Sequence, residues 1–235
     1  MIKYSIIIGT YNHLEDCLKP CCEALMKYTD MSDKEIIIVA NGCTDGTREY
    51  VESLPAPFRL LWFDEPLGFP VANNYGILAS SGEYVILLNN DALLLNQERD
   101  EWIRMLEKPF ADPKVGLTCP IILWVPGIGY NIAIFFCVMI RRDMFARFGI
   151  INTEYKVGYG EDAEFCVKMC LGGYTMARVP GETRPGDECI VGGFPIYHMG
   201  QTTVKEQPGW DEIKENNMLI LSNNLKTYET KKEEQ

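Results

Sequence analysis

Histidine and clustered positive charge are scarce in this sequence. The 235 residues include two histidines, and 22 lysines and arginines stand against 33 aspartates and glutamates, which gives a formal net charge of −11. Because nucleic-acid binding depends on cations that meet phosphates, this composition argues against a nucleic-acid partner. If the protein binds a phosphorylated ligand, we expect a metal ion or backbone amides to assist.

A CxxC pair is also missing, although the chain contains nine cysteines. An odd number of cysteines in a chain of this length does not indicate a disulfide framework. Cys17 and Cys21 are four residues apart, as are Cys166 and Cys170, and this spacing places two thiols on one helix face. We expect reduced, structural cysteines, with a metal cluster as the alternative, and a reducing, cytoplasmic compartment.

No charged-then-apolar leader precedes the first apolar run, IKYSIII. Residues 115–140 contain no charged side chain and are long enough to cross a bilayer. Prolines and glycines break this stretch into the shorter pieces 117–125 and 131–140. We therefore predict two buried strands around an exposed aromatic loop, Trp124–Tyr130, and no transmembrane segment.

What the sequence does contain is an alternation of apolar runs with helical patterns. Strands that alternate with helices favour a parallel sheet with right-handed crossovers. The predicted strands are 4–10, 35–41, 58–63 and 84–90, and the predicted helices between them are 14–28, 47–54 and 71–80.

The regular alternation of strands and helices ends after a further predicted helix at 97–110. The two apolar pieces follow, then a helix in the second half of 152–173 and a strand at 174–180. The charged tail, TKKEEQ, is predicted to be frayed. No repeat or linker is visible, so we predict one α/β domain, 1–235.

The fourth predicted strand ends in Asn89, Asn90 and Asp91. Ligands of open α/β sheets gather at the carboxyl ends of the strands. A carboxylate there can hold a divalent cation, which bridges the oxygens of a diphosphate. A simple turn of Asn and Asp is the alternative explanation. Asp91 is the one acid of the triplet, so it is the predicted metal ligand.

Five segments occur in the order and spacing of one enzyme family: SIIIGTYNHLEDCLKPCCEAL, EIIIVANGCTDGTREYV, PLGFPVANNYGI, YVILLNND and GYGEDAEFC. Over about residues 3–200 they resemble the inverting glycosyltransferases of family 2, and NND resembles its rhamnosyltransferase-like branch. The resemblance implies a GT-A fold, with a Rossmann-like half (1–91) that binds the nucleotide-sugar and a half (92–235) that binds the acceptor and carries the C-terminal tail. A mixed central sheet flanked by helices joins the two halves.

By this resemblance, the loop of Thr10, Tyr11 and Asn12 cradles a uracil base. Asn12 is also suited to cap the helix that begins near Leu14, and both roles are compatible.

Ala40 stands where family members commonly carry an acid that binds the base, so Asn41 or Asp45 is the expected substitute. Turn chemistry and polar helix positions are the alternative explanation for the next donor segment, GFPVANNYGI. The further donor-binding candidates are Gly68, Asn73, Asn74, Asn89 and Asn90.

The resemblance adds His198 to Asp91 as a ligand of Mn²⁺ or Mg²⁺, although a lone histidine at a strand end is usually only packed. Glu161 and Asp162 open a helix, where the helix dipole favours acids whatever the chemistry. By resemblance, Asp162 is the general base, because a sugar hydroxyl is a poor nucleophile at neutral pH. The acceptor-side candidates are Trp124, Tyr159, Glu161, Glu164 and Trp210, and steadying the helix is the alternative role of Glu161 and Glu164. Lys156 and Lys205 are candidates to reach the diphosphate.

The resemblance thus implies a metal-dependent inverting glycosyltransferase that moves rhamnose or a hexose from a nucleoside-diphosphate sugar, UDP-linked by expectation, to a glycan or glycoprotein hydroxyl. A sugar-nucleotide nucleotidyltransferase is one alternative, but GTYNHLE lacks the expected glycine-rich basic loop. A non-catalytic sugar-binding module is the other, and it would need neither Asp91 nor Asp162.

Overall fold

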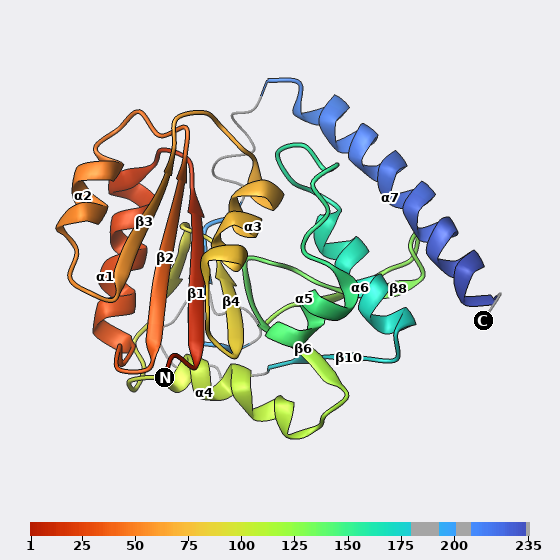
Figure 1. Cartoon of the computed structure of the whole chain (residues 1–235), viewed down its shortest axis with the longest axis horizontal. Helices are drawn as coiled ribbons and strands as arrows, with labels where there is room; N and C mark the ends of the chain where they lie inside the picture. The colour runs from red at the N-terminus through yellow and green to blue at the C-terminus, as the bar shows by residue number, and fades with distance from the viewer. Residues whose placement is uncertain (180–192, 201–207, 234–235) are drawn as a thin grey trace.

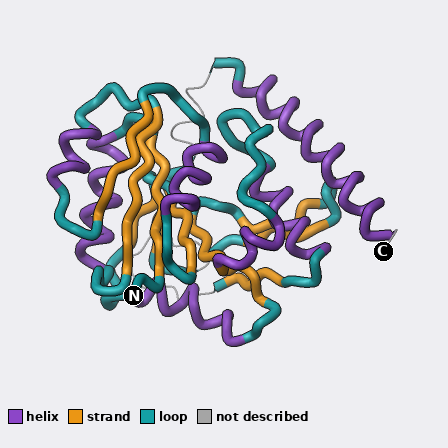
Figure 2. Tube along the Cα trace, viewed as in Figure 1, coloured by secondary structure: helices purple, strands orange, loops and turns teal. Residues whose placement is uncertain are grey.

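A mixed seven-stranded sheet forms the centre of the protein (Figures 1 and 2). The structure is a computed structural model that describes residues 1–179, 193–200 and 208–233. Strands β4, β1, β2 and β3 are parallel, as predicted, whereas β9 runs antiparallel to both β4 and β6. In spatial order the strands are β10 (Thr175–Arg178), β6 (Val115–Cys119), β9 (Cys137–Arg141), β4 (Tyr84–Leu88), β1 (Tyr4–Thr10), β2 (Lys34–Asn41) and β3 (Phe58–Phe63).

Helices cover both faces of the sheet, which explains why the strands β1, β2 and β4 consist largely of buried apolar residues. Alternate residues of β1 enter different cores: Ile6 and Ile8 pack on one face and Ile7 on the other, all fully buried. The first face carries α1 (Lys19–Tyr28), α2 (Thr47–Ser53) and α4 (Glu101–Glu107), and the second carries α3 (Phe69–Ala79), α5 (Arg142–Phe148), α6 (Glu161–Leu171) and α7 (Trp210–Glu233).

The uncharged stretch 115–140 forms four strands instead of the two predicted. Between β6 and β9, the strands β7 (Ile122–Val125) and β8 (Tyr130–Ala133) form a hairpin outside the main sheet. Trp124 is 59% exposed on this hairpin. The turn between the two strands holds Pro126, Gly127 and Gly129, and Pro120 lies between β6 and β7. None of the helices in the described ranges has the length and apolar character needed to cross a membrane.

Several helix boundaries differ from the predictions. The helix expected at 97–110 begins at Glu101 and ends in a 3₁₀ turn, Lys108–Ala111, and a π-helical turn, Leu14–Leu18, precedes α1. The tail predicted to be frayed is helical as far as Glu233, because α7 buries an apolar stripe that includes Leu221 and Leu225. The sequence prediction missed α7, since charged and amide side chains surround that narrow stripe.

Candidate functional site

A cleft of about 550 Å³ opens at the carboxyl ends of β1, β2 and β4. Its size is that of a small-molecule site. Of the predicted site residues, those that line it are Thr10, Tyr11, Asn41, Gly68, Asn89, Asn90, Asp91, Lys156, Tyr159, Glu161, Asp162, His198 and Trp210. Lys205 lies outside the described residues. The structure therefore brings most of the predicted donor, metal and acceptor candidates to one place.

Asp91 and His198 meet although 107 positions separate them, since 198 − 91 = 107. A short antiparallel pairing of β5 (Ala92–Leu94) with β11 (Ile196–His198) joins the two segments. His198 Nε2 lies 3.2 Å from Asp91 Oδ1, and Asp91 is 5% exposed. A carboxylate oxygen next to an imidazole nitrogen is a donor set that suits Mn²⁺.

The imidazole of His198 is held in place from two sides. Its ring stacks on Phe136 with centroids 4.2 Å apart and planes 13° from parallel. The side-chain nitrogen of Asn89 lies 3.4 Å from His198 Nε2. The sequence does not predict Phe136 as a site residue, because nothing in an apolar run shows that this phenylalanine stacks on a histidine of the site.

The amides of Asn41 and Asn90 brace the loops of the cleft. Asn90 donates to Thr10 Oγ1 at 3.0 Å, and Asn41 donates to the Thr10 carbonyl at 2.7 Å. The side-chain oxygen of Asn41 accepts a hydrogen bond from Leu67 N at 3.1 Å. These residues thus shape one side of the cleft by connecting the ends of β1, β2 and β4.

Asn12 and Asp45, the residues with predicted base-binding roles, are not among the residues that line the cleft. Asn12 Oδ1 accepts a hydrogen bond from Thr44 N at 2.8 Å. Asp45 accepts hydrogen bonds from Leu14 N and from the Thr47 hydroxyl. The expected capping of the helix at Leu14 is therefore made by Asp45, and the prediction that Asn12 caps it is wrong.

Asn73 and Asn74 of α3 are buried beside the cleft but do not line it. Asn73 donates to Phe69 O at 2.8 Å within its own helix. The side chain of Asn74 donates a hydrogen bond to Ile151 O and accepts one from Ile151 N. These two bonds join α3 to the second half of the chain. In this structure, the hydrogen bonds of both side chains therefore connect parts of the protein.

Glu164 and Trp124, both predicted on the acceptor side, also lie away from the cleft. Glu164 is 1% exposed and accepts hydrogen bonds from Tyr155, Asn152, Asn224 and Tyr228. Because this carboxylate accepts hydrogen bonds from four side chains of the protein, Glu164 has a structural role and connects α6 to α7.

Glu161 and Asp162 begin α6 and face the cleft together. Burial, and then the negative charge of Asp162, raise the pKa of Glu161, and burial raises the pKa of Asp162. Asp162 Oδ1 accepts a hydrogen bond from Ala163 N at 2.7 Å, while Glu161 Oε2 is buried and has no hydrogen-bond partner among the described residues. The pair can therefore share one proton near neutral pH.

The model of the family described as "Glycosyl transferase family 2" matches residues 5–133, which are 129 of the 235 residues. The chain belongs to glycosyl transferase family 2. Glycosyltransferase AglE of Haloferax volcanii is 35% identical over 91 residues, which cover 37% of this chain and 30% of AglE. The family 2 chain spans less than a third of the length of the first curated relatives that it matches.

Solved structures resemble this family 2 chain at low sequence identity. The mannosyltransferase PcManGT of Pyrobaculum calidifontis, solved with GDP-Man and Mn²⁺, is 21% identical with a TM-score of 0.62, covering 75% of this chain and 54% of its own. GalNAc-T7, solved with UDP, GalNAc and Mn²⁺, is 15% identical with a TM-score of 0.62, covering 74% and 42%. The predicted fold is confirmed as GT-A-like.

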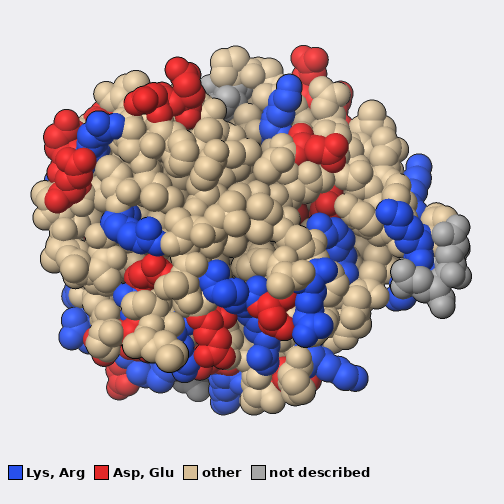
Figure 3. Space-filling model, viewed as in Figure 1, with Lys and Arg blue, Asp and Glu red and all other residues tan. Residues whose placement is uncertain are grey.

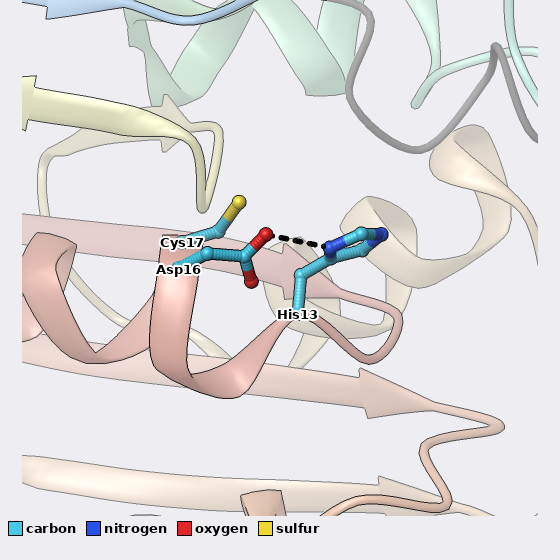
Figure 4. A group of neighbouring side chains, drawn as sticks. All are labelled: His13, Asp16 and Cys17. Carbon is cyan, nitrogen blue, oxygen red and sulfur yellow. Dashed lines mark hydrogen bonds and ion pairs between the residues drawn. The ribbon is translucent and has the colours of Figure 1, made fainter.

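A second group of potential metal ligands in the family 2 chain is formed by His13, Asp16 and Cys17 (Figure 4). His13 Nδ1 lies 3.0 Å from Asp16 Oδ2, and the Asp16 side chain is 61% exposed. Burial, and then the charges of Asp16 and Asp91, raise the pKa of Cys17 to about 12. Because a metal binds the thiolate, this site is less suited to an ion than Asp91 with His198.

Proposed function

We propose that this chain is a metal-dependent inverting glycosyltransferase. It transfers a sugar from a nucleoside-diphosphate sugar, with a UDP-linked rhamnose or hexose as the first candidate, to a hydroxyl of a glycan or glycoprotein acceptor. The observation that carries this proposal is that one cleft holds both the Asp91–His198 pair and the Glu161–Asp162 pair. The first pair suits the departing diphosphate, and the second suits the attacking hydroxyl.

The cleft as a whole is too acidic to accept a diphosphate without a compensating cation. Its described lining contains the acids Asp91, Glu161 and Asp162, with Lys156 as the one lysine or arginine. A divalent cation held by Asp91 and His198 would neutralise charge on the leaving diphosphate. Lys156 would contact a phosphate, and Thr10, Tyr11 and Gly68 would line the nucleoside.

Asp162 is the proposed general base. Its carboxylate takes the proton of the acceptor hydroxyl while the hydroxyl oxygen bonds to the anomeric carbon. The bond from that carbon to the diphosphate breaks on the opposite side, and its electron pair leaves with the phosphate oxygen. Attack opposite to the leaving group inverts the anomeric configuration. Glu161 would hold an acceptor hydroxyl through its buried oxygen.

The shared sheet supports treating both halves as one domain, because β4 of the first half pairs with β9 of the second. Acidic side chains lie among the basic ones on the face drawn in Figure 3, which agrees with a small anionic ligand better than with nucleic acid. The eight described cysteines form no disulfide with one another, consistent with the proposed reducing, cytoplasmic location.

The testing experiment is a thermal-shift screen of UDP-, GDP- and dTDP-sugars with and without Mn²⁺, followed by assays of nucleotide release. A ligand that binds the folded state raises the melting temperature according to its occupancy. We expect Mn²⁺-dependent stabilisation by one nucleotide class and release that requires Asp162. Pyrophosphate release from a nucleoside triphosphate would instead favour the nucleotidyltransferase, and sugar binding without any turnover would favour the binding module.

A further inference from the structure

The backbone that leads into α6 has an unusual conformation. Four consecutive residues have positive φ angles: Val157 at 64°, Gly158 at 137°, Tyr159 at 92° and Gly160 at 104°. A positive φ at a non-glycine residue is sterically unfavourable, and it persists where the surrounding structure imposes it. We call residues 156–160 the elbow loop. It ends at Glu161 and Asp162, so its path decides where those two acids lie.

One side of the elbow loop rests on the start of α3. Phe69 N donates to Val157 O at 2.8 Å. Gly68 approaches so closely that a Cβ atom there would lie 3.0 Å from Val157 N. The side chain of Phe69 also lies close to Gly158, where an added Cβ atom would come within 3.3 Å of the Phe69 Cβ. These contacts join the elbow loop to the nucleotide side of the cleft.

The other side of the elbow loop is held by α7. The side-chain amide of Asn217 donates to the carbonyls of Lys156 at 3.1 Å and Gly158 at 2.8 Å, and Asn217 is 2% exposed. Both hydrogens of one buried amide are thus used on the same loop. At the start of α7, the Trp210 ring meets the Tyr159 ring edge to face, with centroids 6.0 Å apart.

α7 is itself firmly attached to α6, which it follows along the outside of the protein (Figure 1). Asn217, Leu221, Leu225 and Tyr228 are spaced so that they share one stripe of the helix. Leu221 and Leu225 are buried in the core, and Tyr228 donates to Glu164 Oε1 at 2.9 Å. The amide of Asn217 is therefore presented by a fixed element.

We propose that α7 is the element that organises the acceptor side of the cleft, with Asn217 as a positioning residue for Glu161 and Asp162. Asn217 acts through the elbow loop and touches no reacting atom. Trp210 and Tyr159 form the wall that this arrangement completes. The part of this inference that concerns catalysis rests on the proposed function, whereas the placement of the elbow loop by Asn217 does not. The match to the family model ends at residue 133, well before α7.

The test compares Asn217→Ala and Asn217→Asp with Asn216→Ala. Asn216 is the adjacent, exposed asparagine of the same helix, so it controls for changes in α7 itself. Hydrogen–deuterium exchange reports the elbow loop directly. We expect amides 157–161 to exchange at least about tenfold faster in both Asn217 variants and to be unchanged in the control.

The second measurement is turnover of UDP-glucose and GDP-mannose, with water as acceptor, together with the Kd of UDP and GDP in Mn²⁺. We expect kcat to fall about tenfold or more in the Asn217 variants, while the Kd changes less than twofold. Asn217→Asp should be at least as impaired as Asn217→Ala, because it sets a carboxylate against two carbonyl oxygens. A packing role alone predicts the reverse order, since aspartate keeps the shape of asparagine.

Unchanged exchange of amides 157–161, or equal losses in nucleotide binding and kcat, would overturn the inference. If the wild type shows no turnover of any nucleotide-sugar, the proposed function fails while the exchange experiment still decides whether Asn217 holds the elbow loop. The two proposals can therefore fail separately.

Discussion

His198 Nε2 lies 3.2 Å from Asp91 Oδ1, at the point where strands β11 and β5 pair. The carboxylate belongs to the first half of the chain and the imidazole to the second half. A cation that binds both atoms would therefore also fasten the two segments together. Metal binding and the order of the β5–β11 pairing should be linked.

The first prediction concerns this pair. Replacing Asp91 by Asn should abolish most of the Mn²⁺-dependent tightening of UDP or GDP, and His198→Gln should weaken it by about tenfold or more. Titration calorimetry with and without Mn²⁺ measures both effects. Asp211→Asn is the matched control, since that carboxylate is 93% exposed on α7. If Asp91→Asn retained the full Mn²⁺ effect, the metal assignment would be wrong.

The second prediction is a pH dependence of turnover. Asp162 must be ionised to accept a proton, and burial raises its pKa above the ordinary aspartate value of about 4. Turnover should therefore rise with pH along a limb whose midpoint lies clearly above that value. Asp162→Asn should remove turnover and keep nucleotide binding. A limb centred near pH 4, or activity retained in Asp162→Asn, would exclude Asp162 as the base.

The sheet was predictable from sequence because its strands are buried on both faces. The predicted boundaries of 4–10 and 58–63 match β1 and β3. The roles of individual polar residues were harder to predict, since the sequence does not distinguish an asparagine that hydrogen-bonds to the backbone from one that faces a ligand. Asn74 shows this, because its partner is the backbone of Ile151, 77 positions away.

Long-range contacts explain the other differences. Asp45 caps the helical turn at Leu14 across 31 positions, and no local pattern identifies that pairing. α7 was missed because its stability comes from the contacts of Leu221, Leu225 and Tyr228 with other elements, whereas its own sequence is mostly polar. The proximity of Asp91 to His198 was suggested by family resemblance alone.

The third prediction tests whether Glu164 has a structural role and no role in the site. Glu164→Ala should lower the free energy of unfolding by about 3 kcal/mol or more, because it leaves several buried donors without their acceptor. Glu154→Ala, at an exposed carboxylate that shares the partners Asn152 and Asn224, is the control and should cost much less. Urea denaturation measures both variants. Equal stability of the two would contradict the structural role.

Glu164 also has a pH signature. Burial opposes its ionisation, but the surrounding hydrogen bonds outweigh burial and lower its pKa. A lowered pKa in the folded state means that the carboxylate stabilises the protein above its unfolded pKa, about 4.3. That contribution is lost as the pH falls through the folded pKa. The free energy of unfolding should therefore decrease less at acid pH in Glu164→Ala than in the wild type.

The last prediction has the opposite sign and concerns Glu161. Burial, and then the charge of Asp162, raise the pKa of Glu161 above the unfolded value of about 4.3. Between these two pKa values the unfolded chain has released the proton and the folded chain retains it, so stability declines as the pH rises. Each unit by which folding raises the pKa costs about 1.4 kcal/mol above that window.

Glu161→Gln cannot ionise, so it should avoid this loss. We expect its melting temperature to equal that of the wild type near pH 4.5 and to exceed it by at least about 2–4 °C at pH 8.5. Scanning calorimetry across this range is the measurement, and Glu212→Gln, at an exposed residue of α7, is the control. Parallel curves for the wild type and Glu161→Gln would mean that Glu161 ionises normally. In that case the buried oxygen of Glu161 would have a partner that keeps it charged, and the carboxyl pair would not share a proton near neutral pH.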